Sequence, residues 1–391
     1  SSLDDYISLA QKNSPLLNDF NNQQFSLKLD SLKLRADYAT KVNALGDAYY
    51  SPLFGTWGYN GTVASGQNLA ALVRVSKDIL SKKNKDTRFS SYSIGIQQLL
   101  NQSKITELQL KRAVTEQYIN TFAAQKKYEV NQEIVHLLEQ EDIILKKLTQ
   151  NVVFKQTDYL SFKVTLQQNI LALQQQHADW LNNFATLNYL VGKVENDLQK
   201  LDAPKLEILA TKDFDNSIYS ETYKTDSLKL SNDAKIINFD YQPKISVYAD
   251  GGYSSALTYT PYKNFGSSIG LSVSVPIYDG HKRKMSLEQN KLAQNTLEGY
   301  NKFRKDQYQI QVQQLETQIK EYHKMIATAK EQIVYSKTLI DANLKQLPTG
   351  DVRVADVILS INNYINLKLG LVGYETTVDN LNNHLQNMVV Q

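Results

Sequence analysis

The sequence lacks cysteine altogether and is poor in other residues that carry chemistry. Its 391 residues include 0 Cys, 7 Pro, 3 Met and 5 His. Without cysteine there can be no disulfide, no thiolate nucleophile, no Cys-ligated zinc and no iron–sulfur cluster. The histidines show no spacing typical of metal ligands, so we expect no metal site. No G-x-S-x-G elbow and no phosphate-binding loop occurs either, so we expect no enzymatic activity and no cofactor.

The sequence also lacks a strong excess of charge and any long apolar run. The 43 basic residues are nearly balanced by 40 acidic ones, which leaves a net charge of +3. Because nucleic-acid binding relies on a clear basic excess, we expect no nucleic-acid partner. No run approaches the roughly 18 apolar residues of a membrane-spanning helix. Strands of a membrane barrel alternate in polarity, so the mean hydropathy of −0.42 does not exclude them.

The first residues carry no export signal. Residues 1–5 form neither a basic nor an apolar region, so we expect that an exported protein has already lost its signal peptide. There is no N-terminal cysteine for a lipid anchor, and the sequence leaves open whether such an anchor precedes Ser1.

The two halves of the chain repeat one another. Residues 30–34 recur at 226–230, residues 75–80 resemble 273–278, and residues 158–160 resemble 356–358, at offsets of 196, 198 and 198. Such a constant register predicts two copies of one unit. We place the first repeat at 1–200 and the second at 201–391, with a linker-like seam near Asp202-Ala203-Pro204.

Each repeat is predicted to hold a helix, a β-hairpin, a long helix, a tip and a returning helix. The first repeat has a helix from residue 3 to about 40, a hairpin at about 43–80, the long helix 81–150 and the return helix 157–191. After a first helix of its own, the second has a hairpin at about 243–278, the long helix 284–346 and the return helix 353–390. Strands are expected at 46–60, 68–77, 245–253 and 271–275, with turn-like residues at 258–266. The longer strands suit the roughly 9–11 residues that a tilted strand needs to cross a bilayer.

The long helices are unusual for a globular protein. Residues 81–150 contain one glycine, Gly95, and no proline, and a helix of this length spans roughly 105 Å. One apolar seam follows heptad spacing through Val312, Leu315, Ile319, Tyr322, Ile326, Ala329 and Ile333. Two neighbouring stripes occur earlier, one of Ile134, Leu138 and Leu145 and one of Leu137, Ile144 and Leu148. Paired stripes favour packing on both sides, as in the wall of a tube or equally in an ordinary bundle.

The order of elements and three motifs resemble one family. Residues 242–248 (QPKISVY) resemble a strand that begins after proline, and residues 274–280 (SVPIYDG) resemble a strand-end pattern P-[LI]-[FY]-D-G. Gly350 with residues 356–358 resembles a helix-tip pattern G-x5-D-[VL]-L. In these features the chain resembles the TolC-type outer membrane efflux protein family, and the resemblance covers essentially the whole sequence.

This resemblance implies a mainly α fold with a pair of β-hairpins in a duplicated unit. It further implies a homotrimer in which three times four strands form a 12-stranded outer-membrane β-barrel, continuous with a long periplasmic α-helical barrel. The implied function is that of a passive exit duct for a tripartite efflux pump or a type I secretion system. Its partners would be a periplasmic adaptor, an inner-membrane transporter and outer membrane lipid.

Physical reasoning agrees, because four strands cannot close a barrel and an open sheet edge in lipid leaves backbone groups unpaired. The alternative is a non-porous structural coiled-coil protein of the cell envelope. The sequence determines neither the transported substrate (drug, metal or protein), nor the identity of the partners, nor the resting state of the channel.

The repeats differ at positions that matter for the family pattern. Asp78 stands where the second repeat has Pro276, and Ser81-Lys82 stand where it has Asp279-Gly280. The first tip has Val152 in place of Gly350. We therefore expect two alternating kinds of helix pair, of which only some tips open.

The tips are the candidate gate. By the resemblance, Asp356 lies where family members constrict the periplasmic entrance, and an acidic ring there would attract cations. The candidate gate residues are Asp356, Asp351, Arg353 and Asp158, and the candidate adaptor-docking residues are Thr349, Gly350, Asn151 and Val152. Alternatively, Asp351 merely caps the return helix. Leu359 stands where the family often has a second acid, which weakens the expected ring.

Basic residues follow each hairpin at the same register. They are Lys82, Lys83, Lys85 and Arg88 in the first repeat and His281, Lys282, Arg283 and Lys284 in the second. We call these eight the basic collar and expect them to lie just below the barrel, against anionic head groups. A solvated run of charges is the alternative.

Two further expectations concern aromatic and acidic residues. Trp57, Tyr49, Tyr50, Tyr59, Tyr253, Tyr259 and Tyr262 fit an aromatic girdle at a membrane interface, and equally ordinary strand aromatics. The acidic pair Glu139 and Glu141 on the first long helix is expected to face solvent.

Overall fold

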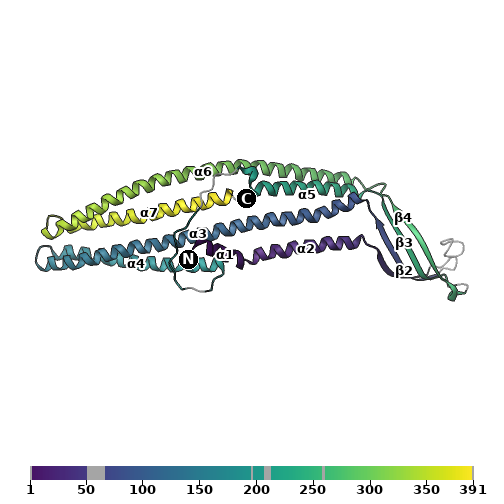
Figure 1. Ribbon diagram of the computed structural model, residues 1–391, viewed down its shortest axis with the longest axis horizontal. Coiled ribbons are helices and arrows are strands. Elements are labelled where there is room, and N and C mark those ends of the chain that lie inside the picture. Colours follow the sequence, from purple (N-terminus) through teal and green to yellow (C-terminus); the bar gives the residue numbers. More distant parts are fainter. Residues whose placement is uncertain (1, 51–66, 195–196, 207–212, 258–259, 390–391) are drawn as a thin grey trace. The chain divides into compact units, whose positions relative to one another are not determined.

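The chain folds into long helices and one small antiparallel sheet. This computed structural model describes residues 2–50, 67–194, 197–206, 213–257 and 260–389 (Figure 1). The predicted class, mainly helical with a small sheet, is confirmed. The chain divides into two units, each built from both halves of the sequence. We call Ser1–Asp19, Gln102–Glu221 and Lys302–Gln391 the helical unit, and Phe20–Asn101 with Thr222–Asn301 the sheet unit.

The helices include two of great length. They are α1 (Leu3–Asn13), α2 (Pro15–Asp37), α3 (Lys82–Gln150), α4 (Gln156–Val191), α5 (Ile218–Asp240), α6 (Lys282–Gln346) and α7 (Val354–Val389). Short 3-10 turns occur at Phe214–Asn216, Pro261–Lys263 and Leu347–Thr349. The 69 residues of α3 and 65 of α6 run without interruption because their interiors hold no proline and only one glycine each.

The sheet has four antiparallel strands in the order β1-β2-β3-β4. Their bounds are β1 Lys41–Tyr50, β2 Gln67–Ile79, β3 Lys244–Ser255 and β4 Phe265–Ser274. The two hairpins, one from each half of the sequence, join where β2 pairs with β3, for example Val73 opposite Gly251. β1 and β4 are the edge strands.

Two strands begin earlier than the sequence pattern indicates. β1 begins at Lys41 rather than Gly46, and β4 at Phe265 rather than Leu271. Residues 51–60 of the expected first strand lie outside the described part of the chain. Gly266, the last of the expected turn-like residues, is a strand residue of β4 instead, opposite Gly252. Gly270 lies opposite Tyr248, and a Cβ on it would stand only 2.2 Å from Cζ of that ring, so a larger residue there would require the ring to move.

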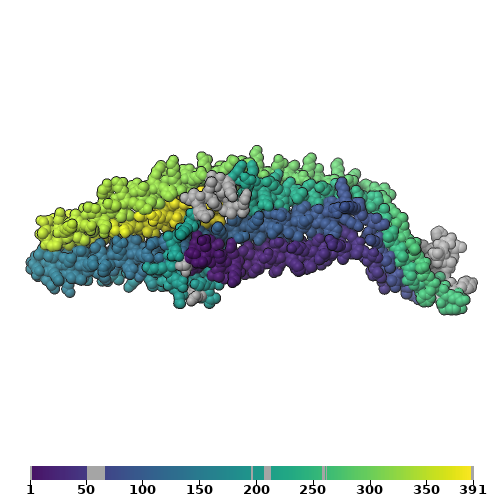
Figure 2. All heavy atoms as spheres, viewed as in Figure 1, coloured from purple at the N-terminus to yellow at the C-terminus, as the bar shows by residue number. Residues whose placement is uncertain are grey.

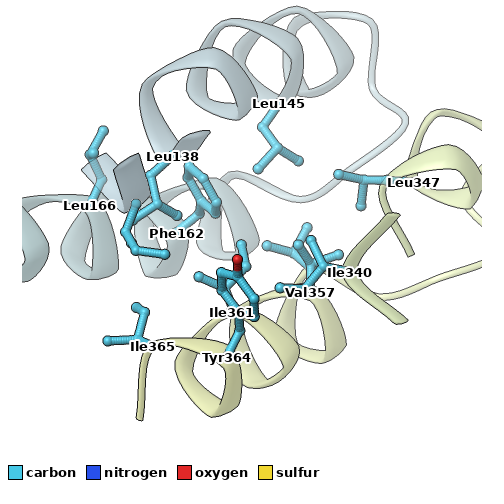
Figure 3. Packing of buried hydrophobic residues seen from close by; sticks show 12 residues of the cluster. Leu138, Leu145, Phe162, Leu166, Ile340, Leu347, Val357, Ile361, Tyr364 and Ile365 are labelled. Atoms are coloured by element: carbon cyan, nitrogen blue, oxygen red, sulfur yellow. The ribbon is translucent and has the colours of Figure 1, made fainter. Parts of the chain in front are cut away.

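Within the described residues, the apolar core of the helical unit has two large clusters and a small third one at Leu315 and Leu385. The tip cluster joins α3, α4, α6 and α7 through Ile134, Leu138, Leu145, Phe162, Leu166, Ile340, Leu347, Val354, Val357, Ile361, Tyr364 and Ile365 (Figure 3). Figure 2 shows the two helical hairpins, α3–α4 in blue to teal and α6–α7 in green to yellow, in contact at this end. The second cluster fixes α1 on α3 and α4 through residues such as Tyr6, Tyr118 and Phe184.

The heptad seam is confirmed as an inward face of α6, since all seven of its residues are buried or half-buried. On α3, the stripe of Ile134, Leu138 and Leu145 is buried, whereas Ile144 in the second stripe is exposed.

The expectation for the acidic pair was wrong in one half. Glu139 is exposed, but only 8% of Glu141 is accessible, and this burial raises the pKa of its carboxyl. The reason is helical geometry, because residues two apart lie on opposite sides of a helix and cannot share a solvent face.

Candidate functional site

The first tip, between α3 and α4, turns through a valine in the left-handed conformation. Val152 has φ 64° and is 87% exposed. The N–H of Val152 donates to the carbonyl of Thr149, and that of Val153 to the carbonyl of Leu148, both at 3.0 Å. This pair of bonds is the Schellman motif, which usually has glycine at the position of Val152. Asn151, beside it, is exposed as well.

The second tip uses glycine at the corresponding position. Gly350 has φ 74°, and its N–H donates to the carbonyl of Leu347 at 3.1 Å. The Thr349 hydroxyl lies 2.8 Å from the carbonyl of Gln346 and 2.6 Å from the Asp351 carboxylate, so its single proton is shared between two acceptors. The exchange of valine for glycine between the repeats therefore leaves the left-handed turn in place.

Arg353 and Asp356 form a two-pronged ion pair at the start of α7. Nε and Nη2 of Arg353 each donate to one carboxylate oxygen of Asp356 at 2.9 Å. Both side chains are exposed. The guanidinium holds the pKa of the Asp356 carboxyl below its usual range, and the N–H of Asp356 also donates to the Arg353 carbonyl at 3.0 Å. The candidate gate carboxylate of Asp356 therefore has a counter-charge on its own chain.

The matching positions of the first tip are arranged differently. Asp158 is half-buried in the first turn of α4, and its N–H donates to the Lys155 carbonyl at 3.1 Å. The structure thus brings together Arg353 with Asp356, and Thr349 with Asp351. Asp158 belongs to the other hairpin, which is joined to the second through the buried tip cluster (Figure 3).

The two arginines of the basic collar hold the end of α5. Arg88, on α3, pairs through Nη2 with the Asp240 carboxylate. Arg283, on α6, donates from Nε and Nη2 to Oδ1 of Asn238, at 3.1 and 2.7 Å. These two side chains therefore have a structural role within the sheet unit.

The remaining six residues of the basic collar are exposed to solvent, with the exception of Lys85. Lys85 is half-buried and its ammonium lies 5.9 Å from the centre of the Tyr38 ring, a cation–π distance. The other five members are exposed; they are Lys82, Lys83, His281, Lys282 and Lys284.

The sheet has one apolar face and one polar face. Register places the following side chains on the apolar face: Val42, Ala44, Ala48, Tyr50, Leu69, Ala71, Val73, Val75, Lys77, Ile79, Ile245, Val247, Ala249, Tyr253, Phe265, Ile269, Leu271 and Val273. In β2 these side chains are exposed, whereas the alternate ones from Asn68 to Ser76 are half-buried. The structure therefore leaves a large apolar surface uncovered, which soluble monomers rarely do.

The polar face carries a cross-strand ion pair between β2 and β3. Nε and Nη2 of Arg74 donate to the two carboxylate oxygens of Asp250 at 2.6 and 2.7 Å. The guanidinium also stacks on the Tyr248 ring, 4.6 Å from its centre. This pair fastens the two hairpins to each other.

Of the proposed aromatic girdle, Trp57, Tyr59 and Tyr259 lie outside the described residues. Tyr49 and Tyr50 are exposed at the end of β1, and Tyr262 is exposed beside the β3–β4 turn. Tyr253 contacts Phe265 edge to face at 5.4 Å. Within the described chain, no helix combines the length and the apolar character needed to cross a membrane.

Comparison with known proteins gives matches in structure only. No protein-family model and no curated protein sequence matches the chain. The outer membrane protein VceC from Vibrio cholerae is 12% identical, covers 99% of this chain and 95% of its own length, and gives a TM-score of 0.77. This is the fold of a TolC-type outer membrane factor. The open-state channel MtrE of Neisseria gonorrhoeae (12% identity, coverage 99% and 88%, TM-score 0.77) shares it. So does the channel CmeC of Campylobacter jejuni (12%, 99% and 85%, TM-score 0.75).

In this TolC-type fold, one half-buried carboxylate with a raised pKa was missed by sequence reasoning. Asp379, on α7, lines a cavity of about 490 Å³ in the helical unit. Burial, with a smaller effect of the neighbouring Glu375 charge, raises the pKa of Asp379 to about 6. A signal was available in the sequence, because Glu375 and Asp379 are like charges four residues apart on a helix otherwise rich in Leu and Asn.

Proposed function

We propose that this chain assembles as a homotrimer into an outer membrane channel, the exit duct of a tripartite efflux pump or type I secretion system. The proposal rests mainly on the sheet. Its apolar face is exposed, and among the described residues its two edge strands, β1 and β4, are each paired on one side only. Lipid is the environment in which such a face is favourable.

Open sheet edges determine the assembly that we propose. In hydrocarbon, each unpaired backbone group costs several kcal/mol, so a sheet there must be closed. Four strands are too few to close around a lumen, whereas three copies pool twelve. The polar face with Arg74 and Asp250 would then line the interior, as expected of a water-filled barrel.

The helical unit supplies the second part of the duct. We propose that the chain is a duplication with repeats at 1–200 and 201–391, and that three copies of α3, α4, α6 and α7 form a helical barrel in the periplasm. The inward heptad seam of α6 and the partly exposed second stripe of α3 support packing on more than one side. The sequence offers no nucleotide-binding loop, so the conduit would be passive and its energy would come from partners.

The tips are the proposed contact with those partners. A periplasmic adaptor, coupled to an inner-membrane transporter, would dock on the exposed turn residues Asn151 and Val152 of one hairpin and Thr349 and Gly350 of the other. The gate would involve Asp356, Arg353, Asp351 and Asp158. Because Arg353 neutralises Asp356, the entrance would attract cations less strongly than a bare acidic ring.

The channel function can be tested on the purified protein. We expect extraction from outer membranes only with detergent, a trimeric mass by light scattering, and discrete conductance steps in planar bilayers. A monomer that stays soluble without detergent, and that gives no conductance, would instead support the structural coiled-coil alternative.

A further inference from the structure

We propose that the junction between β4 and α6, together with the start of α3, is a binding site for the head groups of anionic phospholipids. The site consists of residues 275–284 with Lys82 and Lys83, and we call it the lipid anchor. The inference rests on the proposed membrane location, and it adds a ligand class and a set of residues to it.

Exposed apolar residues continue beyond the last paired residue of β4. Leu271 and Val273 lie on the apolar face of the strand, and the exposed Val275 and Ile277 follow after the strand ends at Ser274. Ile277 is 96% exposed and the following Tyr278 is 81% exposed. An exposed isoleucine followed by a tyrosine suits the boundary between hydrocarbon and head groups, where aromatic rings have one apolar and one wet end.

Cations begin immediately after this apolar segment. Residues 279–284 contain three basic and one acidic side chain besides His281, and residues 77–88 contain five basic and two acidic ones. Arg88 and Arg283 are engaged with α5, so the exposed lysines are the ones free to meet a ligand. Lys77 lies on the apolar face itself, opposite Val247 at the helix-proximal end of β2, where its ammonium could reach the head groups from the hydrocarbon side.

The acidic residue of this segment, Asp279, accepts hydrogen bonds from the backbone. The Asp279 carboxylate accepts the N–H of His281 at 2.9 Å and that of Arg283 at 2.8 Å, which caps the start of α6. Gly280 and His281 both adopt left-handed φ, 62° and 66°. The turn thus carries the chain from the apolar segment to Lys282 and Lys284 within a few residues and in a defined conformation.

A membrane surface fits these features better than a free anion does. The lysines are exposed and spread over two helix starts, rather than converging on one enclosed pocket. A bilayer offers many phosphates in a plane next to hydrocarbon, which matches a row of cations beside an apolar segment. Each lysine near such a surface favours binding by about five-fold.

The test uses the purified full-length protein in mild detergent. Native mass spectrometry would count bound lipids during titration with phosphatidylglycerol and, separately, with phosphatidylcholine. We expect wild type to prefer phosphatidylglycerol, and the K82Q/K83Q/K282Q/K284Q variant to bind it at least ten-fold more weakly, with phosphatidylcholine unchanged. The matched control K302Q/K320Q/K337Q/K345Q changes the same charge at exposed sites elsewhere on α6 and should bind as wild type does.

Two further variants separate charge from folding and from apolar contact. Arginine at the same four anchor positions should keep the preference for phosphatidylglycerol, because it keeps the positive charge. If both four-residue variants lost the preference, misfolding rather than loss of charge would be the cause. The I277S/Y278S variant should weaken the binding of both lipids. Equal loss in the anchor and control variants, or no preference in wild type, would overturn the proposal.

Two measurements distinguish a phospholipid site from a free-phosphate site, and failure of the lipid anchor from failure of the channel. Inorganic phosphate, added at constant ionic strength, should not displace phosphatidylglycerol, and displacement at millimolar concentration would identify a free-phosphate site instead. The same preparations are measured in planar bilayers. Conductance without lipid preference contradicts only the anchor, whereas absence of conductance contradicts the channel itself.

Discussion

Val152 holds a backbone conformation that a β-branched residue rarely adopts. A left-handed φ costs an L-residue about 1–2 kcal/mol because Cβ approaches the following carbonyl. At the corresponding place in the other hairpin, Gly350 adopts the same conformation without that contact. The turn therefore forms despite its residue, driven by the packing of the tip cluster behind it.

We expect Val152→Gly to stabilise the protein by about 0.5–1 kcal/mol, the relief of φ strain less the extra backbone entropy of glycine. Gly350→Val should destabilise it by about 1–2 kcal/mol, since a Cβ there finds room but φ remains unfavourable. The measurement is the thermal unfolding midpoint by circular dichroism. Val153→Gly, at a position without positive φ, is the control and should not stabilise. Shifts of the same sign for the first two variants would refute this account.

The ion pair at the second tip predicts opposite effects for its two members. Arg353→Gln leaves an uncompensated carboxylate and should raise the cation-to-anion permeability ratio, while Asp356→Asn leaves a cation and should lower it. The expected change is roughly two- to five-fold, since unit charges a few ångströms apart in water interact by up to about 1 kcal/mol. The measurement is the reversal potential in a salt gradient.

The double variant should return close to wild type if the pair acts as a neutral unit. Because the guanidinium lowers the pKa of Asp356, the ion pair persists at neutral and mildly acidic pH. It is lost only as pH falls through that lowered pKa, when the carboxylate is protonated and the guanidinium keeps its charge. Single variants that leave selectivity unchanged would remove Asp356 from the gate.

At the scale of the element, α7 carries a carboxylate, Asp379, whose ionisation destabilises the folded protein. The titratable groups lining its cavity come from three helices: Lys126 of α3, His323 and Lys330 of α6, and Glu375 of α7 itself. Lys330 is paired with Glu375 at 3.1 Å and Lys126 with Glu129 at 2.8 Å, so their charges are already partly compensated. Asp379 is therefore left in a half-buried site that favours its neutral form.

We expect Asp379→Asn to stabilise the protein at pH 7.5 by about 1 kcal/mol, a value that allows for partial exposure of the group. The sign follows from a folded pKa of about 6 against 3.8 for the unconstrained carboxyl. Between these two values the folded state binds more protons, so the contribution of Asp379 to stability falls as pH rises. Unfolding midpoints from pH 4 to 8 should show this fall in wild type and not in the variant.

The exposed Asp341 on α6 supplies the control for this measurement. Asp341→Asn should leave the pH dependence as it is in wild type. A wild-type slope that persists in Asp379→Asn would mean that another group titrates in this window.

For the whole molecule, the decisive property is the difference between the two faces of the sheet. Ile269 lies on the apolar face opposite Ala249, and the nearby Ser272 lies on the polar face opposite Ser246. A lysine facing lipid near the bilayer midplane costs about 2–4 kcal/mol, whereas one facing a watery lumen does not.

We therefore expect Ile269→Lys to reduce the amount of assembled trimer in the outer membrane strongly, and Ser272→Lys to leave it close to wild type. The trimer fraction is measured by gel mobility before and after heating of isolated membranes. Equal tolerance of both variants, or equal loss, would contradict a barrel with this face toward lipid.

Several features of the fold could be predicted because their cause is local. Heptad spacing in 312–333 and alternation in 245–253 follow from the geometry of a single helix or strand, and both agree with the structure. The start of β4 was predicted too late because residues 258–266 look like a turn, whereas Phe265 and Gly266 pair with Tyr253 and Gly252 of β3. The pairing of Arg353 with Asp356 could have been inferred from their three-residue spacing on a helix.

What the sequence by itself determined was the kind of element and its polarity, because periods of 3.6 and 2 residues depend only on backbone geometry. The tertiary structure decided which charged side chains form ion pairs within the chain. Arg88 reaches Asp240 and Arg74 reaches Asp250 only because segments more than 150 residues apart come together. The same pairing of β2 with β3 creates the continuous apolar face, since no single strand shows which side its neighbours will share.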